Sequence, residues 1–341
     1  MFLRYFNHLF NRPLNTNQLA LQNFQQGMDF TTLGRTGLRV SVMGLGCGGV
    51  SRLGQAMGKS ESESVDLVRQ ALDLGINFFD TAEAYNTEEI VGKALKGVRR
   101  EDVVLSTKAS MYRDNQLITA TDLIQAVDHS LQKLNTDYLD IYHVHAVQEK
   151  EYPYVVEELV PAQLRLREEG KIRFLGITER FMTDPSHQMM IQAIRDDCWD
   201  VIGIGFNLLN QTARPEILSS AIQKNIGVLG MYSVRRALSS HQNLKTALST
   251  LANMGVIERS MTEDANPLGF LFHEKGAVSL TDAAYRYCRY EPGIHVVLFS
   301  TGNVEHLQAN VSSLLRPPLP LKDLRRLQAM FKQVDNFSGH W

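Results

Sequence analysis

Short apolar segments recur along the chain and alternate with longer segments in which apolar residues repeat every three or four positions. The short segments are rich in valine, isoleucine, leucine and phenylalanine and lack regular polar alternation, which is typical of strands buried on both faces of a parallel sheet. This pattern predicts eight strands, at Val42–Gly46, Asn77–Thr81, Val103–Thr107, Leu139–Val144, Arg173–Thr178, Val201–Phe206, Gly227–Tyr232 and His295–Phe299.

The segments between these strands show helical periodicity. Ser60 and Glu63 have the spacing of a capping box, and an apolar stripe follows them as far as Gly75. Similar stripes lie within 123–134 and 307–314. Ahead of the first strand, the sequence FTTLGRTGLRV predicts a β-hairpin with a glycine-containing turn.

The predicted strands begin 26 to 36 residues apart, except for a last interval of 68 residues. About 30 residues make one βα unit, and eight such units close a barrel. The predicted fold class is therefore α/β, a (β/α)8 TIM barrel with a long loop after strand seven, within 235–276. Loops at the carboxyl end of a barrel usually serve binding, so we expect this loop to contribute to a ligand site.

Composition narrows the possible functions. Of the 341 residues, 44% are apolar and 21% are charged, the balance of a globular protein with a full core. A net charge of −2 without a dense basic run argues against nucleic acid as a partner. No apolar stretch reaches the ~20 residues that a membrane span needs. The three cysteines form no CxxC pair, so we expect no metal site, no disulfide framework and a reducing, cytoplasmic location.

Residues 1–28 contain neither aspartate nor glutamate and carry Arg4 and Arg12, a composition that a transit peptide can have. They also lack serine, which transit peptides usually contain. We interpret them as a flexible or loosely docked N-terminal extension, with organelle targeting as the alternative. Residues 29–341 are expected to form a single barrel domain.

Gly44, Gly46 and Gly49 fit the GxGxxG pattern of dinucleotide-binding loops. That pattern should open a helix at once and be followed by an acidic residue about 20 positions later. Here the next helix is predicted only from Ser60, and Asp80 lies 36 residues beyond Gly44. We therefore expect these glycines to let the first loop approach a ligand rather than to mark a Rossmann fold.

Three successive predicted strands end on polar, ionisable residues. Asp80 ends the second strand and Tyr85 follows it closely, Lys108 closes the third, and His145 closes the fourth. A buried strand has no structural need for a charge at its end. Because the carboxyl ends of parallel strands meet at one face of a barrel, these four residues predict the rim of an active site. His143 is expected to pack behind the barrel.

Five motifs stand out along the chain, in this order: LGRTGLRVSVMGLGCGG, GINFFDTAEAYN, VLSTKA, YLDIYHVH and GKIRFLGIT. They are close to signature segments of the aldo-keto reductase superfamily, which this chain resembles, and they occur in the order found there. The resemblance extends over roughly residues 30–310. LGCGG together with SRLG favours the branch that resembles aldose and L-galactose dehydrogenases. The resemblance implies a barrel capped at its base by the hairpin, a nicotinamide cofactor (NADP or NAD), and hydride transfer to or from a small aldehyde, ketone or aldose lactol.

The catalytic tetrad of that family corresponds to Asp80, Tyr85, Lys108 and His145. Tyr85 would be the general acid/base, because a phenol can protonate the alkoxide that hydride transfer leaves. The Lys108 ammonium would lower the pKa of the phenol, and Asp80 would keep Lys108 charged and oriented. His145 would hydrogen-bond the substrate oxygen.

The resemblance also implies binding residues. The cofactor would contact Thr178, Tyr232, Ser300, Thr301, Gly302, Asn303, His306 and Asn310. The substrate pocket would include Cys47, Gly48 and Tyr112. Glu179 and Gly203 stand where the family commonly has the asparagine and glutamine that hold the carboxamide, and His306 stands where many members have an arginine near the 2′-phosphate. The choice between NADP and NAD therefore stays open.

An alternative function is a nucleotide-sensing regulatory barrel with little turnover. The altered residues at Glu179 and Gly203 motivate it, whereas the complete tetrad argues against it. The expected partner is a small carbonyl or sugar substrate, and the sequence does not specify an oligomeric state.

Overall fold

The computed structural model describes residues 27–340. Eight parallel strands form a closed barrel in the order β10-β11-β12-β3-β4-β5-β8-β9. This confirms the predicted fold class and all eight predicted strands, whose bounds shift by at most three residues. The strands are β3 (Met43–Gly46), β4 (Phe78–Asp80), β5 (Val104–Ser110), β8 (Leu139–Val147), β9 (Ile172–Glu179), β10 (Val201–Gly205), β11 (Gly227–Met231) and β12 (Val296–Phe299).

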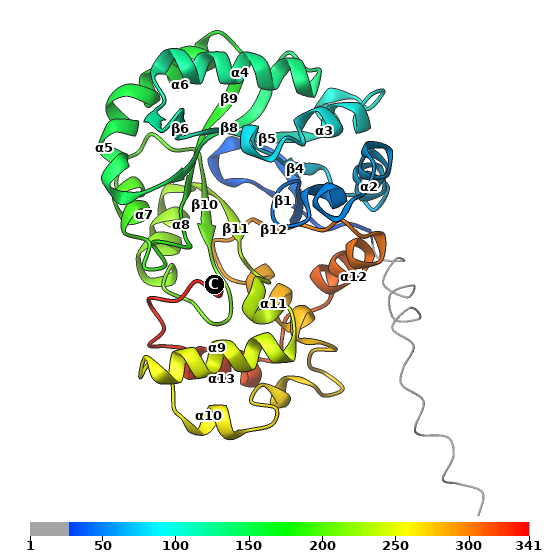
Figure 1. Cartoon of the computed structure of the whole chain (residues 1–341), viewed down its shortest axis with the longest axis vertical. Helices are drawn as coiled ribbons and strands as arrows, with labels where there is room; N and C mark the ends of the chain where they lie inside the picture. The colour runs from blue at the N-terminus through cyan, green and yellow to red at the C-terminus, as the bar shows by residue number, and fades with distance from the viewer. Residues whose placement is uncertain (1–26, 341) are drawn as a thin grey trace, which may run out of the picture.

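At least one helix follows each barrel strand and packs on the outside, as Figure 1 shows. The eight outer helices are α2 (Glu61–Asp73), α3 (Glu88–Ala94), α4 (Ala120–Leu134), α6 (Val160–Glu168), α7 (Gln188–Ala193), α8 (Ser219–Lys224), α11 (Leu280–Arg289) and α12 (Val304–Leu315). The predicted capping box is present, with Ser60 and Glu63 each accepting a hydrogen bond from the other's backbone amide. None of the helices within residues 27–340 is long and apolar enough to cross a membrane.

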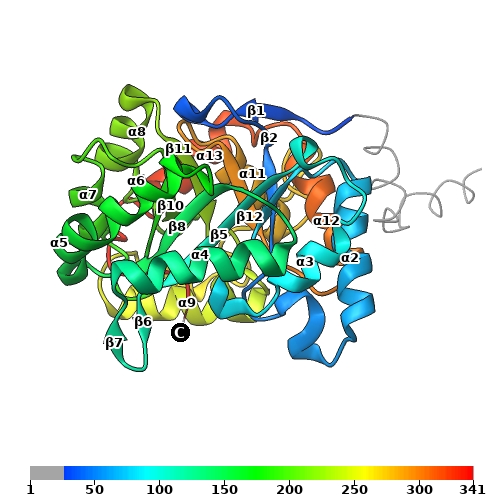
Figure 2. The ribbon, with the colours of Figure 1, turned by 90° about the horizontal axis from the view of Figure 1, so that it is seen from above.

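The predicted hairpin closes the amino end of the barrel. Strand β1 (Phe30–Thr32) pairs antiparallel with β2 (Arg39–Ser41), and Leu33, Leu38 and Val40 are buried against apolar residues at the base of the barrel. Gly34 has a positive φ, and a Cβ there would lie 2.3 Å from the backbone nitrogen of Gly227, so only glycine fits. Figure 2 shows β1 and β2 at one end of the barrel. Apart from Gly27 and Met28, the predicted N-terminal extension lies outside the described residues.

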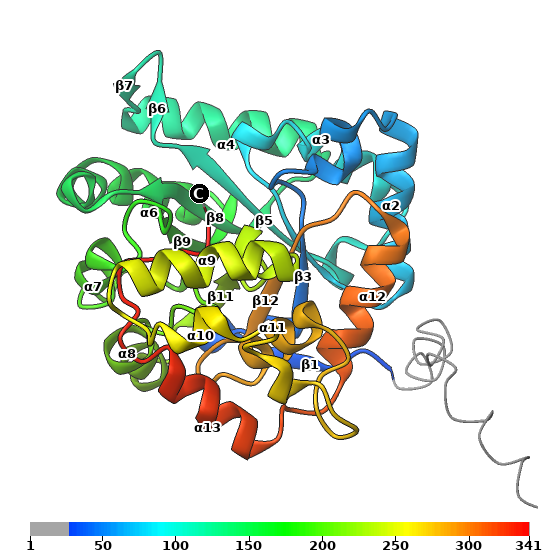
Figure 3. The same cartoon turned by 60° about the horizontal axis from the view of Figure 1, so that its bottom comes forward.

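The predicted long segment after β11 is present and contains two α-helices. It contains α9 (His241–Asn253) and α10 (Ser260–Glu263), and α13 (Leu321–Met330) lies beyond the last barrel helix. Helix α9 forms because Ser240 caps it and because Leu244, Leu248 and Leu251 give it one buried face. It lies at the end of the barrel opposite the hairpin (Figure 2), with α10 beside it (Figure 3).

Candidate active site

The structure brings the four predicted catalytic residues together at the carboxyl ends of β4, β5 and β8. The register pairs Asp80 with Ser106 and His145 with Ser110, so the polar ends of the three strands are neighbours. Tyr85 reaches the same place from a 3₁₀ turn that follows β4. Asp80 and Lys108 are buried, whereas Tyr85 and His145 are half-buried at the mouth of the barrel.

Lys108 and Asp80 form a buried ion pair. The Nζ atom of Lys108 lies 2.6 Å from Oδ2 of Asp80 and also donates to the carbonyl oxygen of Thr81 at 2.7 Å. The second oxygen of Asp80 accepts a hydrogen bond from Oγ of Ser106 at 2.8 Å. Burial opposes the charge of Lys108, but Asp80 and Tyr85 together raise its pKa above the ordinary value. The lysine therefore stays charged although it is buried.

Tyr85 is held from several sides. Its hydroxyl lies 3.3 Å from Nε2 of His145, and Lys108 Nζ lies 5.3 Å from the centre of its ring. Its carbonyl oxygen accepts a hydrogen bond from Nε of Arg52 at 2.9 Å. A Cβ at Gly48 would lie 2.5 Å from the tyrosine ring, so the first loop packs directly on it. The phenol is fixed at the mouth beside a histidine and an ammonium group.

The pKa of Tyr85 shifts in the direction opposite to the one expected from its neighbour Lys108. Burial raises the pKa of Tyr85, and the ammonium of Lys108 lowers it by less, so the net shift is upward rather than downward. The phenol therefore keeps its proton, as a general acid must. Burial, with smaller contributions from the charges of Lys108 and Arg180, lowers the pKa of His145 to about 3. His145 is therefore neutral at ordinary pH and faces the Tyr85 hydroxyl as a hydrogen-bonding group.

His143 lies inside the barrel, and the expectation that it packs behind the barrel is wrong. Residues two apart on a strand point to the same side, so His143 faces inward together with His145. Its Nε2 lies 3.1 Å from Oγ of Ser106, which in turn donates to Asp80. Burial lowers the pKa of His143 well below its ordinary value. Ser106 and His143 thus support the carboxylate of Asp80 from below, and the two-residue spacing on each strand was the signal for both.

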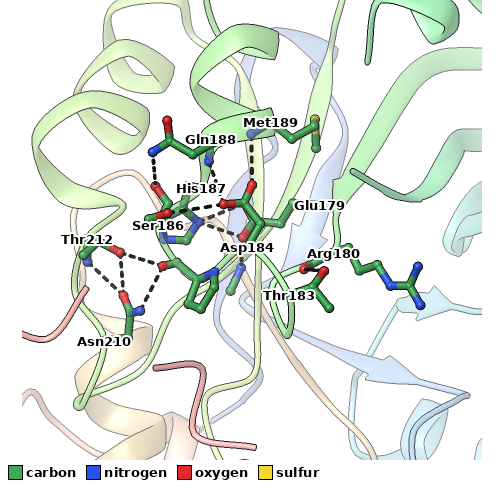
Figure 4. A network of polar contacts seen from close by, with 12 residues as sticks. Glu179, Arg180, Thr183, Asp184, Ser186, His187, Gln188, Met189, Asn210 and Thr212 are labelled. Atoms are coloured by element: carbon green, nitrogen blue, oxygen red, sulfur yellow. Dashed lines mark hydrogen bonds and ion pairs between the residues drawn. The ribbon is translucent and has the colours of Figure 1, made fainter. Parts of the chain in front are cut away.

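The opposite side of the mouth, formed by β9, β10 and β11, departs from the expected carboxamide site. Both oxygens of Glu179 lie within 2.9 Å of Nδ1 of His187, and one also accepts from the Gly205 amide at 2.7 Å. Figure 4 shows Glu179 and His187 pointing toward each other. A Cβ at Gly203 would lie 2.8 Å from Cγ2 of Thr178. Neither residue 179 nor residue 203 therefore presents a side chain to a ligand, and the Thr178 hydroxyl accepts from the Ala146 amide at 2.8 Å.

Tyr232 follows β11 in an unusual backbone conformation, with a φ of 68°. Its ring makes an edge contact with Phe181 at 5.3 Å between centroids, and the Arg235 guanidinium lies 4.2 Å from its centre. Because Tyr232 directly follows β11, it lies at the carboxyl end of the barrel, the same end as the tetrad but across the mouth from it. Phe181, His187 and Arg235 were missed by sequence reasoning.

The predicted phosphate and adenosine segment joins β12 to α12. The Asn303 side chain caps α12 by accepting from the His306 amide at 3.0 Å, and Thr301 accepts from the Asn303 amide at the same distance. Ser300 donates to the Gly48 carbonyl at 2.7 Å, which joins this segment to the first loop. His306 is exposed and Asn310 is half-buried on α12. A Cβ at Gly302 would lie 2.4 Å from Cα of Gly54, so glycine is required there.

The three predicted pocket residues differ in position. Gly48 contacts the Tyr85 ring, as described above. Cys47 is completely buried, so its thiol has no surface that a substrate can reach, and we correct its assignment to core packing. Tyr112 is 42% exposed on the short hairpin of β6 (Tyr112–Arg113) and β7 (Gln116–Leu117), where its hydroxyl donates to Glu151. Figure 2 shows this hairpin at the same end of the barrel as α9.

Comparisons with known proteins find relatives that are named as dehydrogenases or oxidoreductases. L-galactose dehydrogenase from Arabidopsis thaliana is 39% identical over 157 residues, which are 44% of this chain and 48% of that protein. The match thus spans about half the length of that relative. The uncharacterized oxidoreductase YqkF from Bacillus subtilis is 26% identical over 318 residues, which are 90% of this chain and 98% of that protein.

The fold and the family model agree with these relatives. The structure of an aldo-keto reductase from Klebsiella pneumoniae in complex with NADPH matches with a TM-score of 0.66 and 22% identity, over 92% of this chain and 99% of that chain. The model of the Aldo/keto reductase family matches residues 43–332. Because this match runs from the first barrel strand to beyond α13, the chain belongs to the aldo/keto reductase family.

Proposed function

We propose that this protein is an NAD(P)-dependent oxidoreductase that transfers a hydride between nicotinamide and a small aldehyde or ketone, or an aldose in its lactol form. The observation that carries the proposal is the position of the Tyr85 hydroxyl, 3.3 Å from Nε2 of His145 and beside the buried Lys108–Asp80 pair. A protonated phenol, a neutral imidazole and a fixed ammonium group are the elements that acid/base chemistry at a carbonyl oxygen requires.

A nicotinamide dinucleotide fits the residues on the β11–β12 side of the mouth. The twelve-residue helix α12 begins beside Ser300 and Thr301, and the positive end of a helix favours phosphate. The Tyr232 ring offers an aromatic surface for the nicotinamide. The carboxamide has no partner at residues 179 and 203, so stacking on Tyr232 and the hydroxyl of Thr178 would orient the ring. When bound, this cofactor supplies or accepts the hydride.

In the direction of reduction, the Tyr85 O–H donates a hydrogen bond to the substrate oxygen and transfers its proton as the carbonyl carbon gains a hydride. The alcohol leaves, and Lys108 stabilises the phenolate until it is protonated again. Asp80 keeps the lysine directed at Tyr85, and His145 orients the substrate oxygen. In the direction of oxidation, the phenolate of Tyr85 accepts the proton of the alcohol or lactol.

The choice between NADP and NAD depends on the segment between β12 and α12. His306 is exposed at the start of α12 and takes the place of an arginine that would pair with a 2′-phosphate in bidentate fashion. We therefore propose that NADP gains little over NAD. Titration of both cofactors by intrinsic fluorescence tests this, and a preference for NADP above roughly tenfold, ~1.4 kcal/mol, would contradict it.

Turnover assays test the proposed function. The absorbance of the reduced cofactor is followed with a panel of small aldehydes and ketones, and its formation is followed with a panel of aldoses. We expect turnover of at least one compound, either in the reduction of a carbonyl or in the oxidation of an aldose. Sugar oxidation has additional support in the similarity to L-galactose dehydrogenase. Cofactor binding without turnover of any compound would contradict enzymatic function and favour the regulatory alternative.

A further inference from the structure

Glu179 and His187 form a buried pair outside the catalytic tetrad, and the proposed chemistry does not use them. The exposed fraction of the two side chains is 0% and 1%, and Nδ1 of His187 lies 2.8 Å from Oε2 of Glu179. The carboxylate also accepts the Gly205 amide at the end of β10. The pair thus connects the end of β9, the end of β10 and the start of α7.

The loop that carries His187 is fixed on both sides, as Figure 4 shows. The Asp184 carboxylate accepts from the amides of Gln188 and Met189, each at 2.9 Å. The side chains of Asn210 and Thr212 both donate to the carbonyl oxygen of Pro185. His187 therefore has little freedom to move relative to the barrel.

Four side chains contact one another in a row from this pair to the mouth of the barrel, and we name them the aromatic column: His187, Phe181, Tyr232 and Arg235. His187 stacks on Phe181 with centroids 5.2 Å apart and planes at 22°. Phe181 meets Tyr232 at 5.3 Å and 62°, and the Arg235 guanidinium lies 4.2 Å from the tyrosine centroid. Phe181 is buried, and a Cβ at Gly205 would lie 2.1 Å from its ring, so a missing side chain makes room for it.

Two members of the aromatic column, His187 and Tyr232, have strained backbones. His187 has a φ of 63° and Tyr232 a φ of 68°, in the left-handed region that residues other than glycine rarely adopt. Such conformations persist only where the surroundings enforce them, and they concentrate at functional sites. The contacts that act on Tyr232 within the column come from Phe181 and Arg235, and Phe181 is in turn packed on His187.

We propose that Glu179 and His187 are positioning residues, which act through Phe181 to hold Tyr232 in its left-handed conformation with its ring presented to the cofactor. The proposal rests on the proposed function, since it assumes that nicotinamide stacks on Tyr232. In this chain the side chain at position 179 does not bind the carboxamide but fixes the ring on which the nicotinamide lies. Residue 179 thereby contributes to hydride geometry without touching the cofactor.

The test compares substitutions in the aromatic column with matched substitutions elsewhere. Phe181→Leu breaks the column while leaving the Glu179–His187 pair in place, and Glu179→Ala removes its anchor. Glu179→Gln keeps an acceptor for the Gly205 amide and serves as the conservative rescue. Phe331→Leu changes another fully buried phenylalanine, outside the site. Cofactor affinity by fluorescence, kcat and the melting temperature are measured for each protein.

Phe181→Leu and Glu179→Ala should lower kcat by roughly tenfold or more, because small errors in hydride geometry are costly. They should also weaken cofactor binding by roughly two- to tenfold, the range that one aromatic contact provides. Glu179→Gln should stay within about twofold of the unmodified protein, and Phe331→Leu should lower only the melting temperature. Column variants that lose stability but keep kcat and affinity would overturn the proposal. Unmodified protein without turnover would instead contradict the proposed function.

Discussion

The two sides of the barrel mouth are built on different principles. On the side of β4, β5 and β8, buried charges and hydrogen bonds join His143, Ser106, Asp80 and Lys108 in one chain. On the side of β9, β10 and β11, the Tyr232 ring lies in the aromatic column and its backbone has a positive φ. In the proposed function, the first side would control protons, and the second side would control the position of the nicotinamide ring.

This difference sets a ranking of effects. Removing one partner of a buried ion pair leaves an uncompensated charge, which costs about 3–5 kcal/mol. An aromatic contact contributes only about 0.5–1.5 kcal/mol beyond its buried area. Substitutions on the charged side should therefore cause large losses, whereas those on the aromatic side should cause graded ones.

Lys108→Met should have the largest effect. It leaves the buried Asp80 carboxylate without its partner and deprives Tyr85 of the ammonium that stabilises its phenolate. We expect turnover to fall by ~10² or more and the free energy of unfolding to fall by about 3–5 kcal/mol. Urea denaturation and steady-state kinetics measure the two quantities. Lys93→Met is the control, because Lys93 pairs with Glu61 and Glu89 at the surface, and it should change neither appreciably.

The pH dependence of stability should show the contribution of His145. Its folded-state pKa of about 3 lies below the ordinary 6.5, so the folded protein binds fewer protons than the unfolded chain between these values. The stabilisation that this contributes is fully present above pH 6.5 and is lost as the pH falls toward 3. His145→Gln should therefore reduce the loss of unfolding free energy between pH 7 and pH 5 by ~1–2 kcal/mol, allowing for partial exposure. An unchanged loss in the variant would show that His145 is not held neutral.

Gly203→Gln tests whether the aromatic side has room for the common carboxamide partner. A Cβ at this position would already lie 2.8 Å from Thr178 Cγ2 and 3.4 Å from Met231 Cε. We expect overpacking to lower the free energy of unfolding by about 1–3 kcal/mol without tighter cofactor binding, also when Glu179→Asn is added. Thermal unfolding and cofactor titration check this. Tighter binding in a fully stable double variant would mean that the two sides differ less than the structure indicates.

Tyr232→Ala should have the smallest of these effects. Losing the ring should weaken cofactor binding by about 0.5–1.5 kcal/mol, roughly two- to tenfold, and lower turnover because the nicotinamide is less well oriented. Fluorescence titration and kcat measure both. If affinity and rate are unchanged, the nicotinamide does not lie on Tyr232, and the aromatic column has another purpose.

The charged side was largely predictable from sequence, for a physical reason. Asp80, Lys108 and His145 each end an apolar run, and parallel strands bring such ends to one face whatever the loops do. Tyr85 follows from the family resemblance, since a residue on a 3₁₀ turn has no periodic signal of its own. His143 was misplaced although the two-residue period of a strand determines its side.

The aromatic side could not be predicted because its contacts depend on loops. His187 lies eight residues beyond Glu179, in a conformation that no local pattern announces, and Phe181 fills a space that exists only because residue 205 is glycine. Helix α9 is a different case. The long segment that contains it was predicted, and the helical spacing of its leucines at 244, 248 and 251 was a signal for the helix that the prediction did not use.

The most direct test of the central claim, that Tyr85 delivers the proton, measures turnover and cofactor affinity in the same Tyr85→Phe protein. The substitution removes one hydroxyl and keeps the ring that packs on Gly48 and lies near Lys108. Cofactor affinity should stay within about twofold, whereas turnover should fall by ~10² or more. Near-normal turnover in a protein that binds the cofactor normally would contradict the role assigned to Tyr85.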